Sequence, residues 1–355
     1  MQIGLIDADL LDQGTRFPNL ALMKISGYYK KQGHNTKLLT SYQEIENYDK
    51  VFLSKVFTKT QIPVDLSNFD NIEYGGTGFD FDKREFLNAK IEHHYPDYNL
   101  YTDYVNSKIE EGDRKYKWKY YLNFSIGYLT RFCVRQCSFC VNRNKTKVEK
   151  WSPIEEFYNS NRKYLTFLDD NILAYKNAVN IIKEVKNIGK KFEFKQGLDI
   201  RFLKENTAKI LTDAKYYGDY IFAFDDWNER NIIIPKIKLW RQYCNKSTKF
   251  YVLVAYKGLG VDDIIEAFKR INVLMKYNCL AYIMRYKKYE DSEYRGMYIN
   301  LARWCNQPSF YKKKSFREFC EANGENSATM RYLRNFESKH PEVANQYFDM
   351  KYEEM

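Results

Sequence analysis

Three of the chain's seven cysteines fall within eight residues, and no other feature constrains the local structure as tightly. Cys133, Cys137 and Cys140 are separated by three and then two residues, whereas the other four cysteines are scattered singly. Random placement would produce this pair of spacings in roughly three chains in a thousand. Thiols on so short a loop can converge on one soft metal centre.

Several interpretations of this cysteine cluster are open at this point. A structural zinc site normally takes four ligands, and no second Cys-x-x-Cys is present. A disulfide would leave one cysteine of the three over. The three side chains would also fit a loop on which they pack as small apolar residues. Three thiols and an open position favour a cluster or metal that binds a further molecule.

The residues Cys133, Cys137, Phe139 and Cys140 resemble the signature of the radical S-adenosylmethionine (radical SAM) superfamily, in which an aromatic residue precedes the last cysteine. The resemblance implies that the three thiolates hold a 4Fe-4S cluster and that S-adenosylmethionine binds its remaining iron. It implies reductive cleavage to methionine and a 5′-deoxyadenosyl radical, which abstracts hydrogen from a substrate. It also implies a reducing partner such as flavodoxin or ferredoxin.

Length and composition predict a folded protein of one large or two modest domains. The chain has 355 residues, of which 44% are hydrophobic. No apolar stretch of about 18 residues and no signal-peptide pattern occurs, so we expect no membrane segment and a cytoplasmic location. Lys and Arg number 57 against 46 Asp and Glu, and the net charge of +11 favours contact with anions such as nucleic acid.

The first segment, 1–115, alternates strands and helices in the manner of a Rossmann-like parallel sheet. A helix is predicted at 18–32, with Pro18 in its first turn and Gly33 after its end. Strands are predicted at 2–7, 36–40, 51–56 and 72–78. The arrangement is similar to the cobalamin-binding-like domain that precedes many radical SAM barrels. The loop 7–14 lacks the His of that family's Asp-x-His-x-x-Gly motif, so we expect no cobalamin bound through histidine.

The second segment, 116–290, repeats a strand and a helix at the pace of a barrel. Strands are predicted at 122–127, 164–168, 192–196, 220–224, 250–255 and 280–285. Helices are predicted between them, notably at 175–188, 204–215 and 261–277. Six such units match the partial (βα)6 TIM-like barrel that the resemblance implies, with the cysteines directly after the first strand. The remaining segment, 291–355, is predicted to form a helical C-terminal cap.

Barrel enzymes carry their chemistry at the C-terminal ends of the strands. Polar or backbone groups at these ends predict cofactor-binding residues at Asp169, Asp170, Gln196, Asp199, Arg201, Val254 and Ala255. The resemblance assigns one of the adjacent aspartates to the methionine amino group. The residues after the third strand suit ribose hydroxyls and a carboxylate, and the backbone after the fifth suits an adenine. Each residue also fits an ordinary solvated strand end.

The reaction on the final substrate stays open, and no residue acting on it is identified. A small molecule, a peptide or an RNA would each be compatible with a radical SAM enzyme. RNA modification of the methylthiotransferase kind is one alternative, which the positive charge favours. A non-catalytic metal-binding module for nucleic acid is another, and stoichiometric zinc without iron would identify it.

Overall fold

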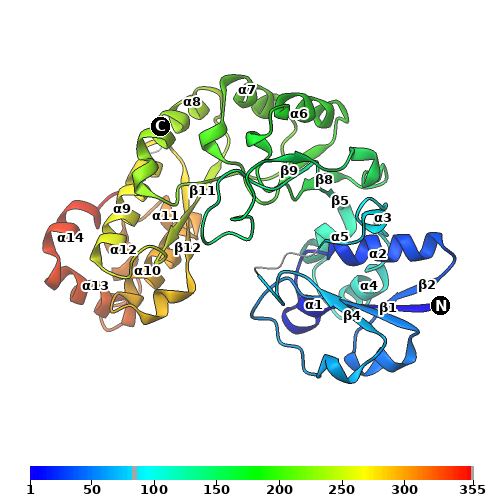
Figure 1. The fold of residues 1–355 in the computed structure, drawn as a ribbon. Coiled ribbons are helices and arrows are strands. Elements are labelled where there is room, and N and C mark those ends of the chain that lie inside the picture. The colour runs from blue at the N-terminus through cyan, green and yellow to red at the C-terminus, as the bar shows by residue number, and fades with distance from the viewer. Residues whose placement is uncertain (82–85, 353–355) are drawn as a thin grey trace. The chain divides into compact units, whose positions relative to one another are not determined.

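The fold is mixed α/β with parallel sheets, as the alternation of strands and helices predicted (Figure 1). The computed structural model describes residues 1–81 and 86–352. Its chain forms two compact units, which we call unit 1 (Met1–Asp170 and Lys190–Lys195) and unit 2 (Asn171–Gly189 and Gln196–Met355). The division into three domains at 115 and 290 stays a prediction.

Unit 1 begins with a four-stranded parallel sheet in the order β2-β1-β3-β4. Its strands are β1 (Gln2–Asp7), β2 (Asn35–Leu38), β3 (Lys50–Ser54) and β4 (Ile72–Gly75). Leu5 lies opposite Leu38 on one side and Phe52 on the other. β1 is buried along nearly its whole length, as expected of a central parallel strand. The parallel α/β arrangement predicted for this segment is confirmed.

Helix α2 (Leu20–Lys31) packs on this sheet, close to the predicted 18–32. Asn19 is its N-cap and accepts a hydrogen bond from the Leu22 amide, so Pro18 precedes the helix instead of occupying its first turn. Gly33 follows the helix with φ +81°, a conformation that glycine adopts at little cost.

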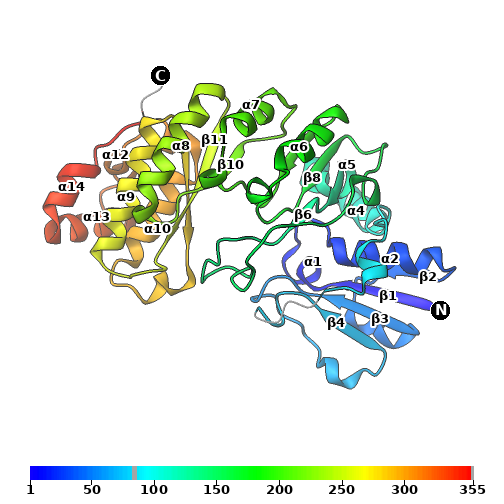
Figure 2. The ribbon, with the colours of Figure 1, turned by 45° about the horizontal axis from the view of Figure 1, so that its top comes forward.

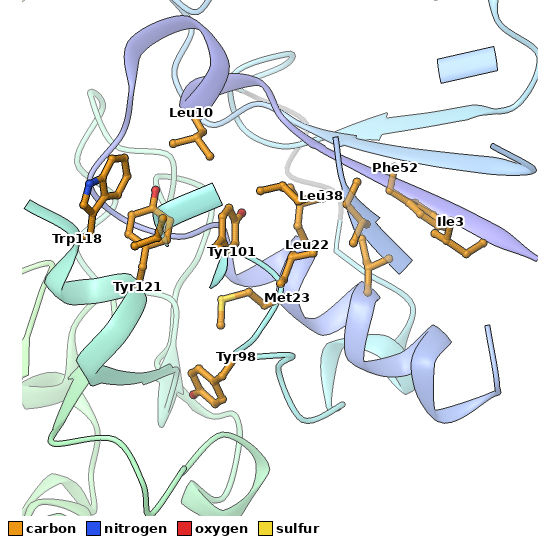
Figure 3. Close-up of a cluster of buried hydrophobic side chains, with 14 residues drawn as sticks. Ile3, Leu10, Leu22, Met23, Leu38, Phe52, Tyr98, Tyr101, Trp118 and Tyr121 are labelled. Carbon is orange, nitrogen blue, oxygen red and sulfur yellow. The ribbon is translucent and has the colours of Figure 1, made fainter. Parts of the chain in front are cut away.

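A core of apolar and aromatic side chains fills the space between this sheet and the following helices (Figure 3). Ile3 and Leu5 of β1 belong to one buried cluster with Leu22 and Met23 of α2. The buried aromatic residues of the cluster are Phe52, Tyr98, Tyr101, Trp118 and Tyr121. A second cluster, which includes Ile6 and Leu53, lies apart from the first. Burial of both clusters fixes the sheet.

The rest of unit 1 contains a second parallel sheet, β5-β8-β9, and a two-stranded antiparallel ribbon, β6-β7. The strands are β5 (Phe124–Gly127), β6 (Thr130–Arg131), β7 (Glu149–Lys150), β8 (Tyr164–Phe167) and β9 (Lys191–Phe194). The remaining helices of unit 1 are α1 (Ala8–Gln13), α3 (Ala89–Glu92), α4 (Thr102–Glu110) and α5 (Lys119–Asn123). Short 3-10 helices are η1 (Tyr42–Asn47), η2 (Leu66–Asn68), η3 (Lys115–Trp118) and η4 (Ile154–Glu156).

Unit 2 contains the parallel sheet β10-β11-β12, with α9 packed on β11 and β12 and with α10 on β12 (Figure 2). Its strands are β10 (Tyr220–Ala223), β11 (Thr248–Val254) and β12 (Leu280–Arg285). Its first helices are α6 (Ala178–Asn187), α7 (Glu205–Asp213), α8 (Arg230–Tyr243) and α9 (Val261–Lys276). The 3-10 helices are η5 (Ile172–Ala174), η6 (Ile200–Phe202), η7 (Trp227–Glu229) and η8 (Lys287–Asp291).

The end of the chain is helical, as predicted for 291–355. These helices are α10 (Arg295–Cys305), α11 (Pro308–Tyr311), α12 (Phe316–Glu321), α13 (Ala328–Lys339) and α14 (Pro341–Tyr347). None of the helices within the described ranges is both long and apolar enough for a membrane span. The six strands predicted for a barrel are all present and form two parallel sheets of three strands each, one per unit.

Asp7 ends β1 with a buried carboxyl group that is 2% exposed. Its Oδ1 accepts a hydrogen bond from the Leu10 amide at 3.1 Å, and its Oδ2 accepts one from the Tyr101 hydroxyl at 2.9 Å. Burial nevertheless raises the pKa of Asp7 from 3.8 to about 6, because the charged form loses more hydration than these bonds return.

We expect Asp7→Asn to remove part of the pH dependence of stability. In the folded state the pKa of Asp7 is about 6, which is above the value of 3.8 that an aspartate has in an unfolded chain. Its protonated form therefore stabilises the fold fully below about pH 4, and this contribution is lost as the pH rises through about 6. The free energy of unfolding of the wild type, relative to the variant, should fall by about 3 kcal/mol across this window.

Urea unfolding at a series of pH values measures this difference. Asp103→Asn, on the exposed side of α4, provides a control that should leave the pH dependence unchanged. A constant difference between wild type and Asp7→Asn from acid to neutral pH would contradict the expectation.

Candidate metal centre

The three clustered cysteines lie on a loop whose two ends are joined by the antiparallel ribbon of β6 and β7. Thr130 lies opposite Lys150, and Arg131 lies opposite Glu149. Residues 132–148 therefore leave the ribbon and return to it at one place. The loop follows β5 after a few residues, which is the position that the sequence predicted for it.

All three cysteines are half-buried, whereas the four cysteines elsewhere in the chain are buried. The Arg135 amide donates to the Cys133 Sγ atom at 3.4 Å, and the Asn142 amide donates to the Cys140 Sγ atom at the same distance. Backbone N–H groups in such positions stabilise the thiolate form of a ligand cysteine. The loop thus presents accessible sulfur atoms with donors already directed at two of them.

The sulfur atoms of the three cysteines are ligands of the type that an iron–sulfur cluster takes. Their side chains do not converge on one point in this structure. Within 1–81 and 86–352, no three side chains of Cys, His, Asp or Glu lie close enough to hold a metal ion jointly. The loop is built of turns, such as the one closed by the Cys140 amide and the Cys137 carbonyl. Convergence of the thiols is therefore a change that metal binding itself would have to bring about.

Two adjacent aspartates clamp the chain where it enters the cysteine loop. Asp169 is fully buried, and its two oxygens accept hydrogen bonds from the Leu129 amide, the Thr130 amide and the Thr130 hydroxyl at 2.6–3.1 Å. Asp170 is half-buried and accepts from the Phe132 amide at 2.8 Å. The end of β8 therefore fixes the segment 129–132, directly before the first cysteine of the loop.

Burial raises the pKa of Asp169 from 3.8 to about 7, although three hydrogen bonds favour its charged form. Both oxygens are already used by the protein, so binding of a ligand to Asp169 would require these bonds to be broken. Asp170 is the more accessible of the two aspartates. Its assignment to the methionine amino group stays a prediction.

A buried ionic cluster lies beside the base of the loop. The Glu92 carboxylate, 7% exposed, accepts from the Lys24 Nζ atom at 3.0 Å, the Trp151 Nε1 atom at 2.9 Å and the Arg131 Nη1 atom at 3.3 Å. Burial opposes the charge of Glu92, but its cationic partners and the indole donor together hold the pKa of Glu92 below its usual value. The cluster contains two cations and one anion.

Arg131 completes this cluster with a cage of aromatic rings. Its guanidinium carbon lies 4.2 Å from the ring centre of Tyr128 and 5.0 Å from those of Phe86 and Trp151. Cation–π contacts of this kind stabilise a desolvated guanidinium. The Arg131 Nε atom is buried and has no hydrogen-bond partner among the described residues. A positive charge is thus held two residues before Cys133.

In unit 2, the predicted residues Asp199 and Arg201 bind each other. The Arg201 Nε and Nη2 atoms donate to the two Asp199 oxygens at 2.6 and 3.0 Å, and its Nη1 atom donates to Glu229 at 2.5 Å. Asn171 donates to Asp199 at 3.1 Å. Gln196 is exposed. The guanidinium of Arg201 is therefore oriented by two carboxylates.

The backbone groups that were predicted to bind an adenine form hydrogen bonds with other residues of unit 2. The Ala255 amide donates to the Asp263 carboxylate at 2.7 Å, and the Val254 carbonyl accepts from the Tyr286 amide at 3.0 Å. Ala255 is buried with φ +59°, a conformation that is uncommon for residues other than glycine. A contact of these two residues with adenine stays a prediction, and it would have to use other atoms.

Sequence reasoning missed the residues that support the loop. It assigned Asp169 and Asp170 to a ligand, whereas the structure shows them bound to the chain before the cysteines. It did not identify the cluster of Glu92, Lys24 and Arg131 at all. Glu92 lies 68 residues from Lys24 and 39 from Arg131, so no local spacing could have indicated the contact.

We expect Asp169→Asn to loosen the entry to the cysteine loop. An amide offers one acceptor oxygen where the carboxylate offers two, so a buried N–H of Leu129 or Thr130 loses its acceptor. An unsatisfied buried donor costs about 1–3 kcal/mol, and these amides should exchange hydrogen about 10- to 100-fold faster. Hydrogen-exchange mass spectrometry of the peptide containing both amides measures the effect, with Asp103→Asn as control. Unchanged exchange would contradict the role of the clamp.

The function of this loop has to be inferred from its own residues. No protein-family model and no curated protein matches the chain. Three half-buried thiols on one clamped loop are the observation from which its function has to be inferred.

Proposed function

We propose that the chain is a radical SAM enzyme in which Cys133, Cys137 and Cys140 hold a 4Fe-4S cluster. The observation that carries the proposal is the set of three half-buried thiols on one loop, directly after the parallel strand β5 and clamped at its base. We further propose that β5 and β8 to β12 belong to a partial (βα)6 barrel. The cysteines would then lie at the end of the strands where barrel enzymes carry their chemistry.

The chain's own residues have defined tasks in this proposal. The three thiolates bind iron, while the amides of Arg135 and Asn142 donate to two of the sulfur atoms. Asp169 and Asp170 hold the loop entrance. When bound, the cluster supplies the electron that cleaves S-adenosylmethionine. The aromatic rings around Arg131 exclude water from the base of the loop.

Arg201 is the residue that we propose for the carboxylate of S-adenosylmethionine. Its guanidinium is already oriented by Asp199 and Glu229, so little conformational freedom is lost when it binds an anion. Asp199 and Gln196 remain our proposal for the ribose hydroxyls. We also propose the cytoplasm as the compartment, because thiols stay reduced there and a flavodoxin or ferredoxin can supply electrons.

Replacing Cys133, Cys137 and Cys140 together by Ala should abolish iron binding and leave the fold intact. Their side chains are half-buried on a loop of turns, so little packing is lost. Anaerobic reconstitution with iron and sulfide should give the wild type about four iron atoms per chain. After reduction with dithionite and addition of S-adenosylmethionine, chromatography should detect 5′-deoxyadenosine from the wild type and none from the triple variant.

The variant Cys244→Ala is the matched control, because it removes a thiol outside the loop and should load iron like the wild type. Full iron content in the triple variant would contradict the assignment of the ligands. One equivalent of zinc, no iron and no cleavage would instead identify the non-catalytic metal-binding module.

Arg201→Ala should weaken the binding of S-adenosylmethionine to the reconstituted protein about 10- to 150-fold. This range corresponds to about 1.5–3 kcal/mol for a lost hydrogen bond to a charged group. Isothermal titration calorimetry measures the dissociation constant, with the exposed Arg295→Ala as control. Equal affinity of Arg201→Ala and wild type would exclude Arg201 from the binding site.

A further inference from the structure

A hollow of about 590 Å³ opens where the three strands of the sheet in unit 2 begin. On the sheet side it is lined by Asp219 before β10, Ser247 before β11 and Leu280 at the start of β12. On the other side it is lined by residues of α11 and by the two lysines that follow this helix. Pockets that bind small molecules usually have volumes of about 300–1,000 Å³. The hollow is therefore large enough for a small-molecule ligand.

Hydrogen bonds to β12 fix the frame of this hollow. Tyr311 of α11 is fully buried, and its hydroxyl group donates to the Cys279 carbonyl, directly before β12, at 3.3 Å. The Asn306 Oδ1 atom accepts from the Ile283 amide at 2.7 Å, and its Nδ2 atom donates to the Ile283 carbonyl at 3.1 Å. α11 is thus held beside β12 (Figure 1). A ligand would lose little affinity to ordering of the hollow.

Positive charge prevails among the lining residues. Lys312 and Lys313 are both exposed, and the Lys313 side chain forms no ion pair or hydrogen bond with any residue of 1–81 and 86–352. The acid among the lining residues is Asp219, whose Oδ2 atom lies 3.4 Å from the Lys249 Nζ atom. This ion pair offsets the charge of Asp219, so the two lysines leave the hollow net positive. A site of this kind attracts an anion.

The remaining lining residues combine hydroxyl groups with apolar surface. Ser247 and Ser309 are exposed, and their hydroxyl groups can donate hydrogen bonds to phosphate oxygens. The buried Leu280 and the exposed Pro308 contribute apolar side chains. Inorganic phosphate would leave this apolar surface without a contact. The lining therefore fits an anion that carries an organic body.

From the volume, the charge and the mixed lining we infer that this hollow binds a nucleoside diphosphate. The diphosphate binds the ammonium groups of Lys312 and Lys313, which form charge-assisted hydrogen bonds to its oxygens. The Asp219 carboxylate accepts hydrogen bonds from the hydroxyl groups of the sugar. Leu280 and Pro308 supply the apolar surface for the base.

The hollow lies at the opposite end of the sheet from the residues that we propose for S-adenosylmethionine. β11 has seven residues, with Ser247 directly before it and Ala255 directly after it. At about 3.3 Å per residue, about 25 Å separate these two residues. The inference therefore concerns a second site and does not rest on the proposed radical chemistry.

Isothermal titration calorimetry of the full-length chain with ADP, in the absence of divalent cations, tests the inference. Inorganic pyrophosphate and adenosine should each bind at least about tenfold more weakly than ADP, because each lacks one part of the ligand. Lys313→Glu should weaken the binding of ADP about tenfold or more, which corresponds to a lost charge-assisted hydrogen bond. Circular dichroism should show unchanged helix content, since the exposed side chain contributes no packing.

Lys183→Glu, on the exposed side of α6, is the matched control because it makes the same change in net charge. It should leave the affinity for ADP within about twofold of the wild type. An excess of S-adenosylmethionine should not displace ADP.

A wild-type chain that does not bind ADP would overturn the inference, as would unchanged affinity in Lys313→Glu or an equal loss in Lys183→Glu. Pyrophosphate or adenosine that binds as tightly as ADP would exclude a nucleoside diphosphate as the ligand. Displacement of ADP by S-adenosylmethionine would place ADP at the other end of the sheet and would also overturn the inference.

Discussion

The buried carboxyl group of Asp169 is the constraint on which the candidate metal centre depends. It accepts hydrogen bonds from two consecutive amides, those of Leu129 and Thr130, in a place that water does not reach. Because no solvent can replace a lost acceptor there, the backbone of these residues has to stay where it is. The cysteine loop, which is made of turns, therefore begins at a backbone segment that Asp169 holds in place at the end of β8.

Backbone strain accompanies this arrangement directly before the first cysteine. Phe132 has φ +73°, and Gln136 within the loop has φ +49°. For side chains larger than glycine, this conformation costs roughly 1 kcal/mol or more per residue. The Phe132 amide is held by Asp170, and its ring contacts Trp151 and Phe86. Tertiary contacts therefore impose a local conformation that the sequence alone would not favour.

The sequence predicted regular elements better than it predicted the supports of the site. Runs of β-branched and aromatic residues predicted the bounds of all six strands of the second segment to within about two residues. Such runs are typical of buried strands. Sequence reasoning gave no bounds for α8, whose interior contains Pro235. At the end of β8, a strand pattern could not distinguish the buried Asp169 from a solvated carboxylate. The contacts of Glu92 depend on tertiary folding alone.

The Glu92 cluster also has a consequence for the folding of this protein during its synthesis. Its carboxylate joins α2, α3, β6 and Trp151, so it cannot be completed until residues 24 to 151 have been synthesised and have met. Contacts of such long sequence separation are slow to form, because the entropy of closing the intervening loop opposes them. The base of the cysteine loop is therefore complete only when these distant segments of unit 1 have come together. A metal would then draw the three thiols together on a base that has already folded, whereas a zinc finger folds only when its metal arrives.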